Sequence, residues 1–186
     1  MSRKMVMLPV LALLMLTVFA PALVEAAVKV PVTATLSGFS VLPGPDSTYW
    51  VTDGGVVQIR NWIGAGVVSV HVDSLPAKDY VMQFSTIASG TVNHEKDIAF
   101  PGPWPEAKGI WTEEMTWSYK VGSDVLGTFV GIWNLKSVGW YLTPVPHNGP
   151  SEGHAVLHGT GIFDGMTLYL DSVGPPAVFT GYALIH

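Results

Sequence analysis

The chain has 186 residues, 9 Lys and Arg, 14 Asp and Glu, a formal net charge of −5 and no cysteine. A mildly acidic chain lacks the clustered basic residues that nucleic acids and anionic membrane surfaces require, so neither is an expected partner. The lack of cysteine excludes disulfide bonds, a thiol-linked lipid anchor, and cysteine-based metal or nucleophile chemistry.

The N-terminus has the pattern of a secretory signal peptide. A basic end precedes an apolar run over residues 5–19, and Val24 and Ala26 fit the small-residue rule for cleavage. We expect residues 1–26 to be removed, which leaves residues 27–186 as a secreted protein, extracellular or periplasmic, with no stable membrane anchor. The alternative is an uncleaved apolar segment that anchors the chain.

After residue 26 the dominant pattern is an alternation of apolar and polar residues, interrupted by Gly and Pro turns. Alternation with period two is typical of strands with one buried face, and no window sustains helical spacing. The predicted strands cover residues 30–36, 55–64, 65–73, 79–88, 108–122, 125–137, 138–142, the stretch 153–170, and 177–185, and residues 48–52 are a further candidate for a short strand. Eight or nine short, evenly spaced strands without a composition break predict one antiparallel all-β domain.

The stretch 153–170 is the most informative of these, because glycines recur at Gly153, Gly159, Gly161 and Gly165 within an alternating pattern. Glycine inside a strand marks a bulge or a corner, and barrels need such points to curl the sheet until its edges meet. We therefore interpret the stretch as a strand that bends, and the domain as an antiparallel barrel of about eight strands.

The run from Gly159 to Gly165, GTGIFDG, resembles the late G-T-G-x-F segment of dirigent proteins and allene oxide cyclase-like barrels. With the G-x-W segment Gly131-Ile132-Trp133 ahead of it, the chain also resembles a group of uncharacterised secreted microbial β-proteins. The resemblance implies an eight-stranded barrel, calycin-like or allene oxide cyclase-like, with a central cavity. Asp164-Gly165 stands where dirigent proteins have a basic residue, and no family catalytic residue can be placed.

Aromatic residues gather on one face of the predicted strand 108–122, where Trp111 and Trp117 flank Glu113. If that face is interior, burial would raise the pKa of Glu113 and suit it to proton transfer or ligand orientation. We expect the face to lie at the exterior or the rim. With Trp133, these side chains are candidate ligand-binding residues, although packing explains most of the seven tryptophans.

His154 and His158 lie four residues apart, which on a strand places them on one face but about 13 Å apart. That distance is too long for one metal ion, so polar lining of a cavity or surface is the favoured interpretation, and we predict no metal and no cofactor. In the irregular segment 89–109, we favour a plug of Phe100 and Trp104 at one barrel end over a binding loop.

Three functions remain open. The first is a barrel that binds a small apolar or aromatic ligand in its mouth. The second is a cyclase or isomerase in which His154, His158 or Glu113 moves a proton, which requires at least two of them to converge on one pocket. The third is a structural surface or matrix protein that associates through an apolar exterior.

Overall fold

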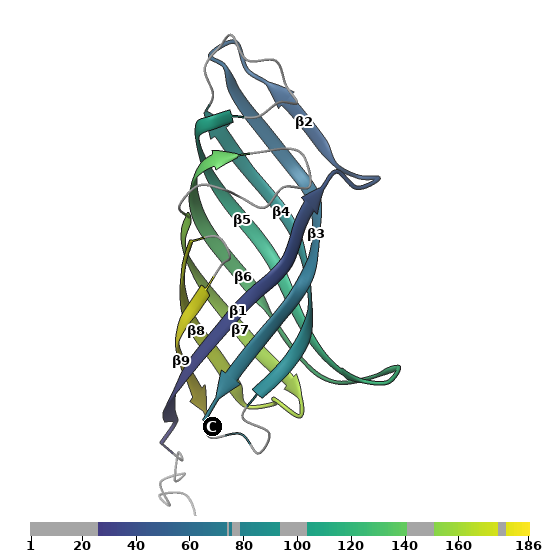
Figure 1. The fold of residues 1–186 in the computed structure, drawn as a ribbon, viewed down its shortest axis with the longest axis vertical. Helices are drawn as coiled ribbons and strands as arrows, with labels where there is room; N and C mark the ends of the chain where they lie inside the picture. Colours follow the sequence, from purple (N-terminus) through teal and green to yellow (C-terminus); the bar gives the residue numbers. More distant parts are fainter. Residues whose placement is uncertain (1–25, 74, 76–78, 94–103, 141–150, 175–177) are drawn as a thin grey trace, which may run out of the picture.

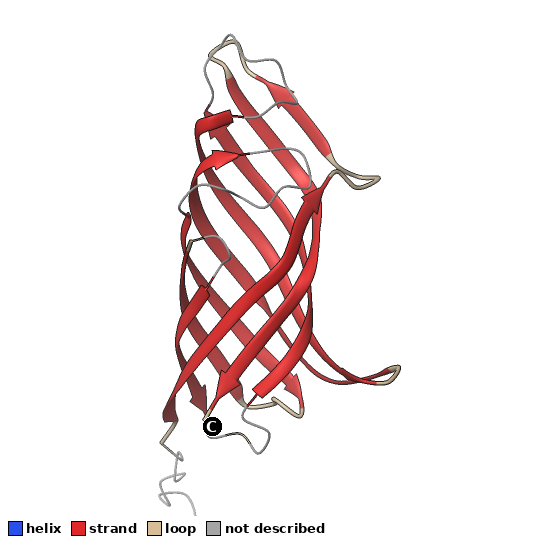
Figure 2. Ribbon diagram, in the orientation of Figure 1, coloured by secondary structure: helices blue, strands red, loops and turns tan. Residues whose placement is uncertain are grey.

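The computed structural model describes residues 26–73, 75, 79–93, 104–140, 151–174 and 178–186, and their regular structure consists of strands alone (Figure 2). The strands are β1 (Val28–Leu42), β2 (Thr48–Val51), β3 (Val56–Val72), β4 (Asp79–Asn93), β5 (Trp104–Val121), β6 (Asp124–Trp140), β7 (Ser151–Gly161), β8 (Met166–Val173) and β9 (Val178–Ile185). The all-β prediction is confirmed.

The strands form one antiparallel sheet that closes on itself (Figure 1). From β3 to β9 each strand pairs with the next, and β1 closes the ring because it pairs with both β9 and β3. The short strand β2 pairs with β3 as an addition to the ring. The fold is therefore a closed eight-stranded barrel with one extra strand, as the strand count predicted.

The strand register determines how steeply the strands tilt. A path that starts at Gly90 in β4 and steps between directly opposed residues returns to β4 at Tyr80, ten residues away. With a rise of about 3.3 Å per residue and strands about 4.8 Å apart, this stagger corresponds to a tilt of about 40°. Eight strands enclose an interior that side chains fill or that holds one small ligand.

The two ends of the barrel differ. At the end that we call the turn end, Gly122 and Ser123 join β5 to β6 and residues 162–165 join β7 to β8. At the other end, which we call the loop end, the connections include residues 94–103 and 141–150, which lie outside the described residues. Strands β3 to β6 extend further at the loop end than β7 to β9 do (Figure 1).

Alternate side chains of every barrel strand point into an apolar core. In β4, for example, buried and exposed residues alternate without interruption from Asp79 to Ala88. At the turn end Phe163 is 1% exposed and stacks on Phe129, with ring centroids 4.7 Å apart. Edge contacts from Phe163 to Tyr80 and Tyr119 complete an aromatic cluster that closes this end.

Several predicted strand boundaries were wrong. The segment 89–109, predicted to be irregular, contains the end of β4 (residues 89–93) and the start of β5 (residues 104–109). Segments 55–64 and 65–73 form the single strand β3, in which Asn61, with φ of 58°, marks a bulge rather than a turn. Segments 125–137 and 138–142 are joined in β6. The stretch 153–170 is a hairpin of β7 and β8, because Gly161 and Gly165 take positive φ and turn the chain.

Some sequence-based predictions fall outside the described residues. Of the predicted signal peptide, residues 1–26, only Ala26 is among the described residues, and Phe100 of the predicted plug lies in 94–103. None of the described residues belongs to a helix long and apolar enough to cross a membrane.

Candidate functional site

The six candidate ligand-binding residues lie on both sides of the barrel wall. Inside are Trp111, Glu113, Trp117 and Trp133, each 3% exposed or less, whereas His154 and His158 point outward. The expectation that the aromatic face of residues 108–122 lies outside or at the rim was wrong. This face carries more apolar area than its polar opposite, so barrel closure turns it inward.

The inward tryptophans pack against glycines and aromatic rings. Trp133 donates a hydrogen bond from Nε1 to Ser172 Oγ at 2.9 Å, and its ring centroid lies 5.1 Å from that of Phe179. Trp117 contacts Phe179 from another side, at 5.5 Å. Trp111 lies where a side chain at Gly90 would otherwise be. These tryptophans therefore build the core, as the packing interpretation predicts.

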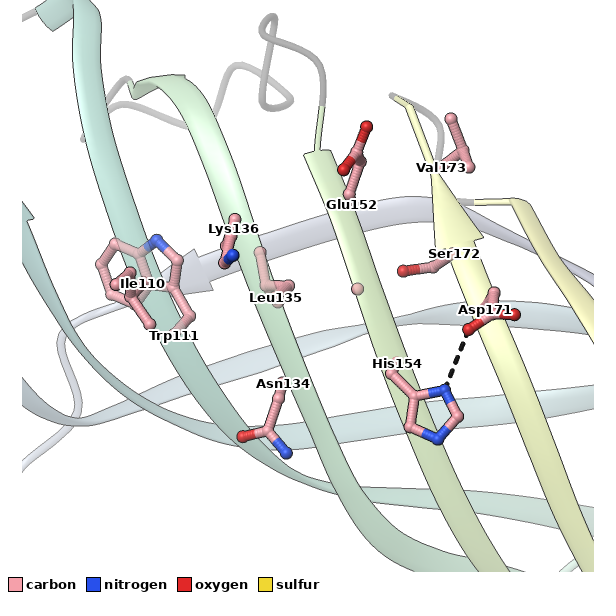
Figure 3. Close-up of a pocket in the computed structure, with 11 residues that line it drawn as sticks. Ile110, Trp111, Asn134, Leu135, Lys136, Glu152, His154, Asp171, Ser172 and Val173 are labelled. Atoms are coloured by element: carbon pink, nitrogen blue, oxygen red, sulfur yellow. Dashed lines mark hydrogen bonds and ion pairs between the residues drawn. The ribbon is translucent and has the colours of Figure 1, made fainter.

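A groove of about 490 Å³ lies at the loop end, over strands β5 to β8 (Figure 3). We call it the loop-end groove. Its lining residues are Ile110, Trp111, Asn134, Leu135, Lys136, Glu152, Gly153, His154, Asp171, Ser172 and Val173. Inward residues such as Leu135 and outward residues such as Ile110 both contribute. The exposed surface of the groove is mainly apolar, and polar or charged side chains line it chiefly on the outer side of the barrel wall.

The polar side of the groove is a row of directly opposed residues on neighbouring strands. Asn134 in β6 faces His154 in β7, which faces Asp171 in β8 (Figure 3). His154 Nδ1 and Asp171 Oδ1 are 2.9 Å apart, and both side chains are more than half exposed. Thr112 extends the row through a 3.0 Å hydrogen bond to Asn134. The row can orient a polar group of a ligand that lies in the groove.

The two histidines do not form a metal site. His154 pairs with Asp171, while the Nδ1 atom of His158 lies 3.2 Å from the Thr167 hydroxyl, nearer the turn end. Within the described part of the chain, no three His, Asp or Glu side chains are grouped so that they could hold a metal ion.

Glu113 is the chemically unusual residue of the interior. It is 3% exposed, and burial raises its pKa to about 7, although the Thr86 hydroxyl beside it opposes the shift. Neither Glu113 Oε2 nor Thr86 Oγ1 makes a hydrogen bond of normal geometry, and Trp117 Nε1 is also buried without a hydrogen-bond partner. Buried polar atoms nearly always have a hydrogen-bond partner, so the unpaired atoms mark the surroundings of Glu113 as a candidate functional site.

Glu113 lies directly below the floor of the loop-end groove. Trp111 and Leu135 oppose each other in β5 and β6 and line the groove. Glu113 and Trp133 form the next inward pair toward the turn end. A ligand in the groove is therefore one residue layer from the buried carboxyl.

The proton-transfer hypothesis needed at least two of His154, His158 and Glu113 in one pocket. Glu113 is inside the barrel and both histidines are outside, so the barrel wall separates them. The structure therefore does not bring two of these three side chains together in one pocket, as this mechanism requires.

A second polar cluster lies on the outer surface of β3 and β4, beside a smaller depression of about 360 Å³. His71 Nδ1 lies 2.6 Å from Asp79 Oδ1, and its Nε2 lies 3.3 Å from Asp73 Oδ1. The hydrogen bond to Asp79, with a smaller effect of Asp73, raises the pKa of His71.

Sequence reasoning missed Thr86, Asn134, Asp171 and Ser172. Each is a single polar residue in an alternating strand, and nothing in its local pattern marks it. Only strand register brings Asp171 to His154 and Ser172 to Trp133. Comparison of the chain with protein-family models, curated proteins and solved structures gives no match.

Proposed function

We propose that this chain is a binding protein that acts after export and holds a small apolar or aromatic molecule in the loop-end groove. The observation that carries the proposal is the groove itself, about 490 Å³ in volume and mostly apolar, at the mouth of a closed barrel. Ligand sites in proteins are typically apolar hollows of this size with a few polar groups, and barrel mouths are a preferred place for them.

The polar row supports the same function. Asn134, His154 and Asp171 occupy one side of the groove, where they can fix the orientation of a polar substituent. The opposite end of the barrel is closed by the Phe163 cluster, which makes the loop end the natural entrance.

A neutral aromatic probe, N-phenyl-1-naphthylamine, tests the proposal by its fluorescence on binding. Ile110 lines the groove and is 65% exposed, so Ile110→Glu should place a charge in the apolar site and weaken probe binding at least tenfold with little effect on folding. Val130→Glu is the matched control, because Val130 is an exposed outward residue of β6 that does not line the groove. No probe binding, or equal loss in both variants, would contradict the proposal.

Exposed apolar residues such as Val81 and Ile87 also occur on the outer face. These residues are compatible with the third function, a structural protein that associates through an apolar exterior, which stays a prediction. A concentration-dependent mass in analytical ultracentrifugation would support it.

A further inference from the structure

Among the residues whose side chains the structure describes, no basic side chain is buried beside the interior acid Glu113. Among the described residues, the buried polar or charged side chains are Thr86, Glu113 and Ser172. The basic residues whose exposure the structure describes, Lys29, Arg60, Lys120 and Lys136, are all exposed. A lone buried carboxyl favours its neutral form until a cation arrives.

The surroundings of Glu113 are those of a cation site. On one side it opposes Trp133 in β6, and on the other it opposes the small residue Ala88, beyond which lies Trp62. Along β5 its inward neighbours are Trp111 and Met115. Tryptophan is the aromatic side chain that attracts cations most strongly, and the attraction increases when the cation is desolvated.

The orphaned atoms specify which cation fits. Glu113 Oε2 and Thr86 Oγ1 are buried and make no hydrogen bond of normal geometry, although the Thr86 hydroxyl is close enough to favour the ionised carboxylate, and Thr86 is 3% exposed. An ammonium group carries three N–H donors and no acceptor, so it can satisfy both oxygens at once. A quaternary ammonium has no such donors and would leave both oxygens unpaired.

We propose that Glu113 receives the protonated amino group of a small amine whose apolar or aromatic body occupies the loop-end groove. The inference rests on the proposed function and adds the chemical class of the ligand. The groove floor formed by Trp111 and Leu135 lies one inward layer, about 7 Å along the strand, from the Glu113–Trp133 pair, so the amino group must pass between these two floor residues to reach Glu113.

Benzylamine and benzyl alcohol are suitable probes, because they have similar size and differ in charge at neutral pH. In calorimetric titrations of the full chain we expect benzylamine to bind at least tenfold more tightly than benzyl alcohol. Glu113→Gln should remove that preference, because it should weaken benzylamine binding at least tenfold more than benzyl alcohol binding. The control is Glu114→Gln, since Glu114 is the adjacent outward, exposed acid.

The pH dependence gives a second readout. The inward residues next to Glu113 on β4 and β6, including Thr86, Ala88, Trp133 and Leu135, carry no ionisable group, whereas the groove is also lined by Lys136, Glu152, His154 and Asp171. The part of the pH dependence that Glu113→Gln removes is therefore the part that belongs to Glu113. Benzylamine affinity should rise between pH 5.5 and pH 8 as Glu113 ionises, whereas benzyl alcohol affinity should stay constant.

The outcomes separate the two proposals. If both probes bind equally, or if Glu113→Gln keeps the preference, the amine inference is wrong and the binding function stands. If neither benzylamine nor benzyl alcohol binds while N-phenyl-1-naphthylamine does, the amine inference is also wrong and the binding function stands. If none of the three binds, both proposals are wrong.

Discussion

Trp133 in β6 donates its indole hydrogen bond to Ser172 in β8, reaching across the intervening strand β7. The bond is possible because β7 has Gly153 at the inward position between them. A Cβ at Gly153 would collide with the Trp133 indole nitrogen and lie 2.8 Å from Ser172 Oγ. This three-residue arrangement connects three strands at the floor of the loop-end groove.

Gly153→Ala should therefore destabilise the protein by about 2 kcal/mol, because the added methyl group overpacks the site and breaks the hydrogen bond. Urea unfolding monitored by tryptophan fluorescence measures the change. Gly54→Ala is the control, since the nearest atom to a Cβ there is Thr52 Oγ1 at 3.8 Å. Equal stability of Gly153→Ala and the wild type would show that the crossing bond does not constrain the barrel.

The buried carboxyl of Glu113 should make stability fall as pH rises. The unfolded side chain ionises near 4.5, whereas the folded one keeps its proton to about pH 7. Between these values the folded state binds the extra proton, so the free energy of unfolding decreases by about 3 kcal/mol in total. Glu113→Gln should remove this decrease and Glu114→Gln should keep it. Unfolding curves from pH 4.5 to pH 8 provide the comparison, and parallel slopes for wild type and Glu113→Gln would contradict it.

The barrel was predictable from the sequence because alternation and turn residues are local signals. The aromatic face of residues 108–122 was recognised as one face, and the structure keeps Trp111, Glu113 and Trp117 together. Whether that face points inward depends on how the sheet closes, which no single strand encodes. A glycine in the sequence also does not show by itself whether the chain turns there. Gly64 lies inside the continuous strand β3, whereas Gly161 turns the chain.

The candidate site was less predictable because it depends on register across strands. His154 was noticed for its spacing from His158, yet its structural partner is Asp171, seventeen residues later on the next strand. A one-residue slip in the β7–β8 pairing would turn Asp171 to the other face. The turn of residues 162–165 sets that register, and interpreting the stretch 153–170 as one strand concealed it.

Phe163 should contribute strongly to stability from its place in that same turn. Its ring stacks on Phe129 and contacts Tyr80 at 5.2 Å, which closes the turn end of the barrel. Phe163→Ala should lower the free energy of unfolding by about 4 kcal/mol, because the cavity left is large and rigidly surrounded. The neighbouring Ile162 is 52% exposed, so Ile162→Ala should change stability far less in the same denaturation experiment. A similar decrease in the free energy of unfolding in both variants would mean that the turn, and not the aromatic cluster, provides the stability.

His71 should titrate above its ordinary range as long as Asp79 is present. The hydrogen bond that the His71 ring donates to Asp79 is the largest cause of the raised pKa, and Asp73 adds a smaller effect, both favouring the protonated ring. The stabilisation from this pair is complete below pH 6.5 and disappears as pH rises through the raised pKa. In NMR titrations of the His71 ring, Asp79→Asn should lower its pKa toward 6.5, and Asp73→Asn should lower it less. An unchanged His71 titration in Asp79→Asn would show that the 2.6 Å contact does not hold the proton in solution.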